Sequence, residues 1–552
     1  MGERWVHVGP TEDVAPLDRP LGDLLLQRLR HHHHALLQVD GPTGEEVSAA
    51  QLLERSMAVA EELRRRGVGP GDVVSAALDN SLEVAYVLLG TLYTGAIYAP
   101  FNPDLHESDV RHLLAILAPR VVLCAPRAER RVRVALAPGA DVVPVARGTA
   151  EWEAFLRPAP AGGADFLANA SADLDGPAVV MCSSGTTGAP KGVMLSHRSL
   201  HFLLILGEKF ESFLTDEQRR VERGLLVLPN FWISGLMASL FNYNGGSPLV
   251  LLPKFDVDVA LAAVQRYRVT ALSLSPPQIA AIAKHPDVEQ YDVTSLRMVG
   301  YGGAVLSPAL RLLAERRLNK TFVQFYGQTE SLVSLLPGAL SKEKPTSVGT
   351  PALNAQAKVI DPETGKAVGP NVEGEICLKN PMLFIGYYKN PQATADMLDE
   401  DGWVHTGDVG YFDEDGYFYI CDRFKELVKY KGVHIAPAEV ESVLAAHEGV
   451  EDAAVVGIEH DEDQEHPVGF VVRAKGHDVS AEQLLQLLKD ELPVYKQLHG
   501  GVHFVEEIPR TASGKIKRRE LRQLARTLRE QKKCAGGEGE HDVAGLTAGV
   551  SG

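Results

Sequence analysis

The side chains best suited to bind phosphate lie together in one segment rich in glycine, serine and threonine, Ser183–Gly192. It follows an apolar run, Ala178–Cys182, that we expect to be a strand. Glycines let backbone amides turn toward an anion, hydroxyls donate hydrogen bonds, and Lys191 adds a positive charge. The segment is not a Walker A loop, because Pro190 stands five residues after Gly185, where that motif has glycine. The candidate ATP- and phosphate-binding residues are Ser183, Ser184, Gly185, Thr186, Thr187, Gly188 and Lys191.

A second polar segment, Tyr326–Glu330, follows the apolar run Phe322–Phe325. We expect this run to be a strand, which places the polar residues at the carboxyl end of a sheet, where open α/β proteins bind ligands. Glu330 offers a hard oxygen ligand for Mg²⁺, and Thr329 can donate a hydrogen bond to a phosphate. The segment therefore indicates a site for a metal ion and a phosphate.

Three later segments also carry charged residues with adjacent glycine or in tight turns. Thr406–Asp408 presents a carboxylate suited to accept hydrogen bonds from two ribose hydroxyls. Asp422–Arg423 precede the segment Lys429–Gly432, and Pro509–Lys515 places one lysine on a glycine-containing loop. Each of these fragments alone is more often an ordinary turn, and Ser183–Gly192 alone fits a flexible surface turn as well as a phosphate site.

Taken in order, the five segments resemble the AMP-forming adenylate superfamily, which includes acyl-CoA synthetases, coumarate–CoA ligases, beetle luciferases and peptide-synthetase adenylation domains. The resemblance extends from about Leu21 to Gln531. The sequence between the motifs is most similar to the coumarate–CoA ligase and luciferase-like branch, as in Gly386–Pro391 and Asp401–Asp408.

The resemblance implies a two-step ligase that uses ATP, Mg²⁺ and coenzyme A. A carboxylate would attack the α-phosphate of ATP to give an acyl-adenylate and pyrophosphate, and the thiol of coenzyme A would then displace AMP. By this resemblance the catalytic residues are Lys515, Thr329, Glu330 and Lys429, with Glu330 also the metal ligand. The implied AMP-binding residues are Gly302, Gly303, Ala304, Gln324, Tyr326, Gly327, Asp408 and Arg423. The implied acyl-pocket residues are Trp232, Gly303 and Gln328.

The resemblance also implies that the small C-terminal domain rotates about a hinge, here Lys425, between the two half-reactions. Lys515 would then leave the active site, and the segment with Lys431 and Gly432 would enter and form the channel for coenzyme A. Glycine at position 432 would let the narrow pantetheine arm pass, because it has no side chain.

One position departs from the family pattern. The segment Pro229–Trp232 carries tryptophan where coumarate ligases have a histidine that gates the acyl site. Aromatic residues occupy this gate in other branches, so we expect ligase activity to survive and beetle-type bioluminescence to be poor. Trp232 is also compatible with a simple packed core aromatic.

The elements that position these residues are expected to form an α/β fold. Short apolar runs alternate with helical patterns from about Val73 to Gly369, which favours two α/β subdomains with mostly parallel strands. Gly374–Asp415 suggests a β-rich antiparallel subdomain, and a small, mobile α+β domain follows. The expected divisions are an adenylation domain at 1–424, a C-terminal domain at 425–533 and a disordered tail at 534–552.

Composition excludes several classes of protein. The 552 residues include 55 Lys and Arg against 72 Asp and Glu, a net charge of −17, which disfavours nucleic-acid binding. No signal peptide is evident, and the apolar stretch Leu225–Phe241 is interrupted by polar residues and glycine, so we expect no transmembrane segment. A cytoplasmic location is expected; many relatives are peroxisomal, but Val550–Gly552 is not a Ser-Lys-Leu signal.

Neither cysteines nor histidines predict a structural metal site. The five cysteines are scattered and lack CxxC spacing, which also disfavours a disulfide framework. The run His31–His34 lies in a helical pattern that begins near Leu21, and consecutive histidines on a helix point to different faces. We interpret the run as a solvated helical face.

The leading hypothesis is an ATP-dependent acyl-CoA synthetase for a hydrophobic acid, either a medium- or long-chain fatty acid or a 4-coumarate-like aryl acid. The alternatives are a luciferase-like or carrier-loading adenylating enzyme, and a non-catalytic nucleotide-binding homologue. A carrier protein is not expected as a partner, because no carrier segment follows the small domain. Retention of Lys191, Glu330, Asp408 and Lys515 argues against the non-catalytic alternative.

Overall fold

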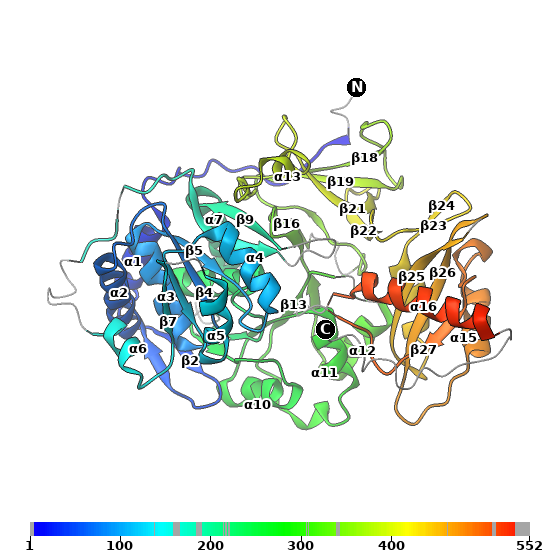
Figure 1. Cartoon of the computed structure of the whole chain (residues 1–552), viewed down its shortest axis with the longest axis horizontal. Helices are drawn as coiled ribbons and strands as arrows, with labels where there is room; N and C mark the ends of the chain where they lie inside the picture. The colour runs from blue at the N-terminus through cyan, green and yellow to red at the C-terminus, as the bar shows by residue number, and fades with distance from the viewer. Residues whose placement is uncertain are drawn as a thin grey trace.

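A large α/β body carries a small C-terminal domain on one side (Figure 1). The computed structural model describes residues 5–136, 139–157, 166–169, 171–183, 190–212, 215, 218, 221–304, 306, 308–337, 343–460, 462–510 and 515–535. Of the tail predicted at 534–552, residues 536–552 lie outside the described residues, and Cys534 and Ala535 are the end of helix α16 (Arg518–Ala535). No described helix has the length and apolar character needed to cross a bilayer.

The first α/β unit is built on a seven-stranded sheet with the order β20-β9-β8-β5-β4-β6-β7. Its strands are β4 (Val73–Ala77), β5 (Ile97–Pro100), β6 (Val121–Cys124), β7 (Asp141–Pro144), β8 (Pro177–Ser183), β9 (Lys191–Ser196) and β20 (Gly386–Tyr387). Strands β4 to β8 pair in parallel, whereas β9 pairs antiparallel with β8 and with β20. The helices of this unit are α2 (Ala49–Arg65), α3 (Leu82–Thr94), α4 (Glu107–Leu117), α5 (Pro126–Ala135) and α6 (Ala150–Phe155).

The second α/β unit contains another seven-stranded sheet, with the order β14-β13-β12-β10-β11-β2-β3. Its strands are β2 (Leu36–Asp40), β3 (Glu46–Ser48), β10 (Gly224–Leu226), β11 (Leu249–Leu251), β12 (Ala271–Leu274), β13 (Met298–Tyr301) and β14 (Phe322–Gln324). Its helices are α1 (Leu21–His31), α7 (His197–Ser212), α9 (Ile233–Gly245), α10 (Val257–Tyr267), α11 (Pro276–Lys284), α12 (Pro308–Leu318) and the short 3₁₀ turn η2 (Val288–Gln290).

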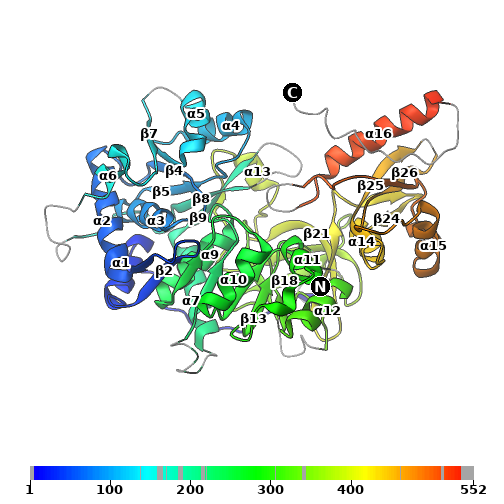
Figure 2. The same cartoon turned by 90° about the horizontal axis from the view of Figure 1, so that it is seen from below.

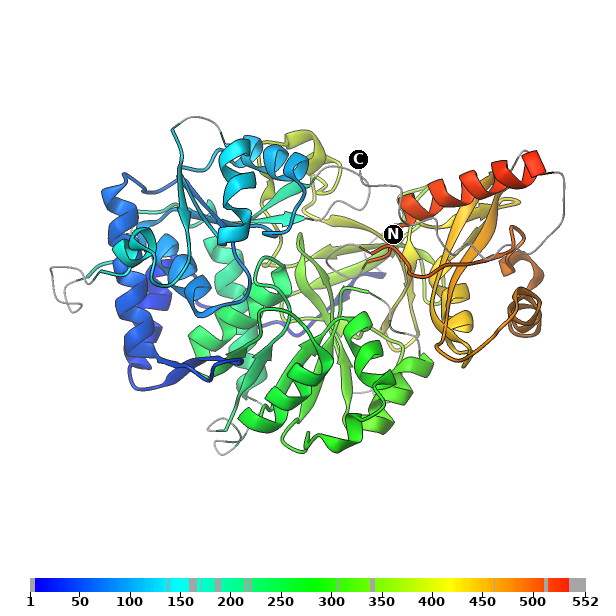
Figure 3. The same cartoon turned by 60° about the horizontal axis from the view of Figure 1, so that its bottom comes forward.

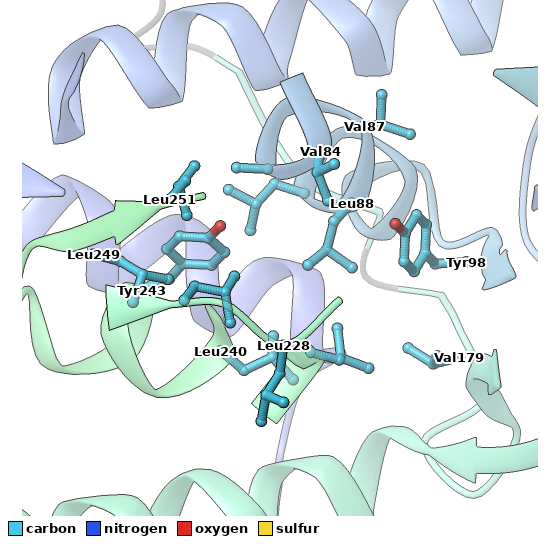
Figure 4. Packing of buried hydrophobic residues seen from close by; sticks show 14 of the residues in the cluster. Val84, Val87, Leu88, Tyr98, Val179, Leu228, Leu240, Tyr243, Leu249 and Leu251 are labelled. Carbon is cyan, nitrogen blue, oxygen red and sulfur yellow. The ribbon is translucent and has the colours of Figure 1, made fainter. Parts of the chain in front are cut away.

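The two units share one hydrophobic core. Every residue of α3 is buried, as expected for a helix that is apolar on all sides and enclosed between layers. Its Val84 and Leu88 lie near Tyr243 of α9 and Tyr98 of β5 (Figure 4). The two α/β units therefore form one continuous body.

The β-rich unit joins the two sheets to the small domain. Its main sheet has the order β1-β18-β19-β21-β22 and is antiparallel throughout, formed by β1 (His7–Val8), β18 (Gln356–Ile360), β19 (Gly374–Lys379), β21 (Val404–Phe412) and β22 (Phe418–Arg423). A second small sheet is formed by β15 (Tyr326–Gln328), β16 (Leu332–Leu336) and β17 (Thr350–Pro351). The short helix α13 (Pro391–Ala395) follows β20.

The small domain lies to one side of this body in the two further views (Figures 2 and 3). Its sheet is formed by β23 (Val428–Tyr430), β24 (Val433–Ile435), β25 (Val450–His460), β26 (Gln464–Arg473) and β27 (Val502–Phe504). Its helices are α14 (Pro437–Ala445), α15 (Ala481–Glu491), the 3₁₀ turn η3 (Val494–Lys496) and α16 (Arg518–Ala535). Helix α16 packs Leu521, Ala525 and Leu528 into its core.

The predicted fold class is confirmed: an α/β body with a β-rich unit and a small α+β domain. Local bounds differ from the prediction by one residue at a strand end. The strand expected at Ala178–Cys182 is β8, Pro177–Ser183, and the strand expected at Phe322–Phe325 is β14, Phe322–Gln324. Strand β9 was not expected from the sequence; it is short and pairs back antiparallel on β8. Cys124, Cys182, Cys377 and Cys421 are free thiols, which agrees with the expected absence of disulfides for these four residues.

Candidate active site

A continuous cleft of about 2920 Å³ runs between the two α/β units, the β-rich unit and the small domain. This volume is several times that of a site for one small ligand, so the cleft has room for more than one substrate. Most of the residues predicted from the sequence meet here. The predicted residues that line the cleft are Lys191, Trp232, Gly302, Gly303, Ala304, Gln324, Tyr326, Gly327, Gln328, Thr329, Glu330, Asp408, Arg423, Lys425 and Lys515.

Asp408 is a buried carboxylate held by three side chains. The Tyr326 hydroxyl donates to its Oδ2 at 2.7 Å, and Gln328 Nε2 donates to the same oxygen at 2.9 Å. Arg423 Nε lies 3.0 Å from Oδ1, because Asp408 and Arg423 are direct partners in the β21–β22 ladder. Burial, and then the charge of Asp408, raises the pKa of Tyr326 well above its usual range, so Tyr326 remains a neutral donor. The carboxylate is thus fixed in position while still able to accept hydrogen bonds from a ligand.

Glu330 lies in the turn after β15 and lines the cleft. The Tyr387 hydroxyl donates to its Oε1 at 2.7 Å, and the Lys191 ammonium lies 4.8 Å from the centre of the same tyrosine ring. Burial, and then the charge of Glu330, raises the pKa of Tyr387, so this phenol also stays protonated. Tyr387 therefore connects the carboxylate to the lysine across the cleft.

The strand ends beside these charges bring the backbone close to the cleft. Tyr301, at the end of β13, donates a hydrogen bond from its hydroxyl to Gln324 Oε1 at 3.1 Å. A Cβ atom at Gly302 would lie 2.8 Å from the carbonyl oxygen of Phe325, so a larger residue would push two strand ends apart. Gly303 has a φ of +82°, a conformation that favours glycine.

Lys515 enters the cleft from the small domain, next to the start of α16. Burial lowers the pKa of Lys515, and the positive charge of Arg423 lowers it further, whereas Asp408, Glu330 and Glu426 act in the opposite direction. These influences mean that the lysine from the small domain and the carboxylates from the large body lie in one electrostatic environment. The arrangement can therefore bind an anion between Lys515 and the large body.

The sequence matches two protein families. The AMP-binding enzyme family matches residues 27–388, and the AMP-binding enzyme C-terminal domain matches residues 439–515. The chain belongs to the AMP-binding enzyme family. Lys191, Glu330 and Lys515 lie within the matched ranges, whereas Asp408, Arg423 and Lys425 lie between them.

Individual relatives agree with this assignment. The 4-coumarate–CoA ligase 5 of Oryza sativa subsp. japonica is 36% identical, over 94% of this chain and 97% of its own length. The probable 4-coumarate–CoA ligase 1 of Dictyostelium discoideum is 33% identical, over 92% and 95%. The crystal structure of ATP-bound MatB from Rhodopseudomonas palustris superimposes with a TM-score of 0.84 at 28% identity, covering 92% of this chain and 99% of that one. The protein is therefore an AMP-forming acid–CoA ligase, a class whose substrates are ATP, an acid and coenzyme A.

In this AMP-binding enzyme one wall of the cleft is apolar. Trp232 precedes α9 and lies edge-on to Phe231, with 6.2 Å between the ring centres, and it also packs against the main core. This position is compatible with Trp232 as a gate of the acyl site and as a packed core aromatic, since the ring lines the cleft and contacts the core. Met237 and Val333 line the same region.

The predicted residues of the coenzyme A channel lie apart from the cleft, except for the hinge residue. Lys425 is in the turn between β22 and β23 and lines the cleft. Lys429 is exposed on β23, and Lys431 and Gly432 are exposed on the β23–β24 turn. None of these three lines the cleft in the described part of the chain. Gly432 has a φ of +80°.

The predicted phosphate segment is described only at its two ends. Ser184, Gly185, Thr186, Thr187 and Gly188 lie outside the described residues. The segment is bracketed by Ser183 at the end of β8 and Lys191 at the start of β9, which are antiparallel partners.

Sequence reasoning missed the contacts that two residues near the cleft make. Tyr387 lies in the Gly386–Pro391 segment, but only the fold brings its hydroxyl to Glu330. Asp422 Oδ2 accepts a hydrogen bond from the Ala438 amide at 3.0 Å, in the first turn of α14, and burial raises the pKa of Asp422 to about 6. A residue before Lys425 thus caps a helix after Lys425. In the sequence, the only indication of a special function for Asp422 is its position directly before Arg423.

Proposed function

We propose that this ligase activates a hydrophobic carboxylic acid, with an aryl-propenoic acid such as 4-coumarate as the first candidate and a medium- or long-chain fatty acid as the second. The observation that carries the proposal is the meeting of Lys515 from the small domain with Asp408, Arg423 and Glu330 in one cleft. The names of the rice and Dictyostelium relatives support the aryl acid.

In the proposed first half-reaction the nucleotide lies along the ends of β13, β14 and β21. Asp408 accepts hydrogen bonds from the ribose hydroxyls, because its carboxylate can accept more than the three contacts it already has. Arg423 holds that carboxylate in position. The backbone at Gly302–Ala304 and the Tyr326 ring line the adenine side.

The charges needed at the phosphates come from both domains. Lys191 and the Ser183–Gly188 residues hold the leaving pyrophosphate, and Thr329 donates to a phosphate oxygen. Lys515 lies between the attacking carboxylate and the α-phosphate, where negative charge increases in the transition state. Phosphoryl chemistry of this kind depends on position and charge more than on covalent help from the protein.

Glu330 is the proposed Mg²⁺ ligand. Its Oε1 accepts from Tyr387, and Oε2 accepts no hydrogen bond from the described residues, so one hard oxygen faces the cleft for a cation. Bound Mg²⁺ would neutralise charge on the phosphate oxygens. The residues present therefore fit this ion.

The proposed second half-reaction uses the other face of the small domain. Rotation about Lys425 removes Lys515 from the cleft and brings in Lys429, Lys431 and Gly432 beside the thiol of coenzyme A. The exposed position of this segment supports the proposal, because it lies outside the cleft while Lys515 lines it.

The acid is proposed to bind along the apolar wall at Trp232, Gly303 and Gln328. The flanking segments Phe231–Met237 and Gln328–Leu332 contain no lysine, arginine or histidine. This favours an acid with one carboxylate over a dicarboxylate.

The test is AMP release by the purified protein with Mg-ATP, with and without coenzyme A, across fatty, aryl-propenoic and short-chain acids. We expect AMP only with certain hydrophobic acids, turnover only with coenzyme A, and a loss of at least about 100-fold in Lys515→Ala. Lys489→Ala is the control, because Lys489 is exposed on α15 of the same domain and does not line the cleft. ATP binding without AMP release for every acid would contradict the proposal and favour the non-catalytic alternative.

A further inference from the structure

A group of metal-ligand side chains lies at the tip of the β25–β26 hairpin, outside the cleft. His460 ends β25, His466 lies in β26, and Asp463 lies in the turn between them. His466 Nε2 is 2.8 Å from Asp463 Oδ2, and His460 Nδ1 is 3.8 Å from the same oxygen. The three side chains are 18–29% exposed, so the group is partly sheltered yet open to an ion from solvent.

We propose that His460, Asp463 and His466 form a binding site for a divalent transition-metal ion of the Zn²⁺ type. Two imidazole nitrogens and one carboxylate oxygen are a ligand set typical of such ions, with water completing the coordination. Ligand atoms bound at about 2.1 Å in tetrahedral geometry lie roughly 3.4 Å from one another. The two distances to Asp463 Oδ2 lie on either side of that value, so small side-chain rotations close the site.

The position of His460 is the observation that favours a metal ion over a simple ion pair. A pair between His466 and Asp463 needs no second ring, yet the His460 ring stacks on the His466 ring with 3.8 Å between centres and 10° between planes. Among the described residues, His460 Nδ1 accepts only long hydrogen bonds, from the amides of Asp463 at 3.3 Å and Glu462 at 3.4 Å. This nitrogen therefore faces the turn and is weakly bonded.

The same turn holds the Lys429–Gly432 segment. The Lys431 amide donates to the Asp463 carbonyl oxygen at 3.0 Å, and the Gly432 amide donates to Gln464 Oε1 at 2.7 Å. Lys431 Nζ also lies 3.5 Å from Asp463 Oδ1. An ion that fixes Asp463 would therefore reduce opening of both the hairpin and this segment, and this consequence does not depend on the proposed function.

The run His31–His34 must be removed from the test, since α1 ends at His31 and the following residues are in a turn where exposed imidazoles can bind metal ions. The full chain carrying His31→Gln, His33→Gln and His34→Gln, the three exposed histidines of the run, serves as the reference protein. A second group of possible ligands, Glu375, Cys377 and His405, is the same in every protein compared. Equilibrium dialysis with ZnCl₂ should therefore give one more bound equivalent in this reference than in the same protein carrying both His460→Gln and His466→Gln. His460→Gln and His466→Gln should each weaken that binding by at least about tenfold.

His499→Gln is the matched control, because its ring stacks on Tyr430 and lies 6.1 Å from the His466 ring without joining the group. It should bind Zn²⁺ as the reference does. Equal Zn²⁺ binding by the reference and by His466→Gln would overturn the proposal, as would no binding by the reference.

Hydrogen exchange supplies a second, independent readout. Zn²⁺ should slow exchange of the Lys431 and Gly432 amides in the reference protein and leave them unchanged in His466→Gln. The α15 amides, elsewhere in the same domain, should not respond in either protein. Unchanged exchange at Lys431 and Gly432 in the reference would refute the coupling between the ion and the segment.

Discussion

Tyr387 links two charges that come from distant parts of the chain. Its hydroxyl donates to Glu330, and its ring lies beneath the Lys191 ammonium. Removing the hydroxyl leaves the ring and the lysine contact in place but frees the carboxylate to rotate. The effect should therefore fall on the binding and use of Mg-ATP rather than on folding.

We expect Tyr387→Phe to lower kcat/KM for Mg-ATP by about tenfold, since a hydrogen bond to a charged group contributes about 1.5 kcal/mol or more. Pyrophosphate release at varied Mg-ATP measures this. Tyr388→Phe is the matched control, because the Tyr388 hydroxyl makes no hydrogen bond to the described residues. Equal values for the two variants would show that the Tyr387 hydroxyl has no part in positioning Glu330.

The charged residues of the cleft were predictable because each stands in a short segment with its own local signal. Lys515, Asp408 and Glu330 lie beside glycine or at a strand end. Tyr387 was not predictable in its role, because its partner Glu330 is 57 residues away in the chain and only the fold brings the two together, with the Phe384 amide donating to the Glu330 carbonyl oxygen at 2.8 Å. The His460–His466 group was missed for the same reason, since it depends on the hairpin register.

At the scale of single elements, α1 begins with an unusual partner. Its first residue follows Pro20, which provides no side-chain cap, and the Leu21 amide donates instead to His197 Nδ1 at 3.1 Å. His197 is 2% exposed, and burial lowers its pKa to about 4. The neutral imidazole is thus the form that accepts this hydrogen bond.

This contact predicts a loss of stability as the pH falls. The folded pKa lies below the unfolded value of 6.5, so the unfolded chain binds the proton first and the stability is complete only above about pH 6.5. Between pH 7 and pH 5 the loss should be about 2 kcal/mol. Urea midpoints across this range should fall more steeply in wild type than in His197→Gln. Parallel pH profiles for the two proteins would contradict the assignment.

Helices and strands with a clear apolar periodicity were predicted closely. A strand that depends on pairing with distant strands was not predicted. The helix expected to begin near Leu21 is α1, Leu21–His31, because apolar periodicity is a local feature. The strand expected at Ala178–Cys182 likewise lies within β8, Pro177–Ser183. Strand β9 was missed because Lys191–Ser196 lacks the apolar–polar alternation of a half-buried strand, and its strand character comes from pairing with β8 and β20.

At the scale of the whole molecule, the small domain carries both Lys515 and Gly432, and only Lys515 of the two lines the cleft. The division of the chain near Lys425 remains a prediction, and the proposed rotation gives it a test. A Cβ atom added at Gly432 would meet no atom of the described residues within 4 Å, so there is space for a larger residue in the present orientation.

We expect Gly432→Leu to spare adenylate formation and to slow thioester formation at least about tenfold, because the side chain would block the pantetheine arm. Separate half-reaction assays measure this. Gly476→Leu is the matched control, since Gly476 also has a positive φ of +83° with open space around it, in the same domain. Equal loss of both half-reactions in Gly432→Leu, or equal effects in the two variants, would count against the channel assignment.

The hydrogen bond from the Ala438 amide to Asp422 affects the populations of the two proposed orientations of the small domain. One partner precedes Lys425 and the other follows it, so under the proposed rotation the bond exists in only one of the two orientations. The two half-reactions then share a single small domain, and occupancy gained by one orientation is lost by the other. A stronger bond would favour the orientation of the first half-reaction at the expense of the second. Turnover is greatest when the two orientations are nearly equally populated. The bond between Asp422 and α14 should therefore not exceed a limited strength.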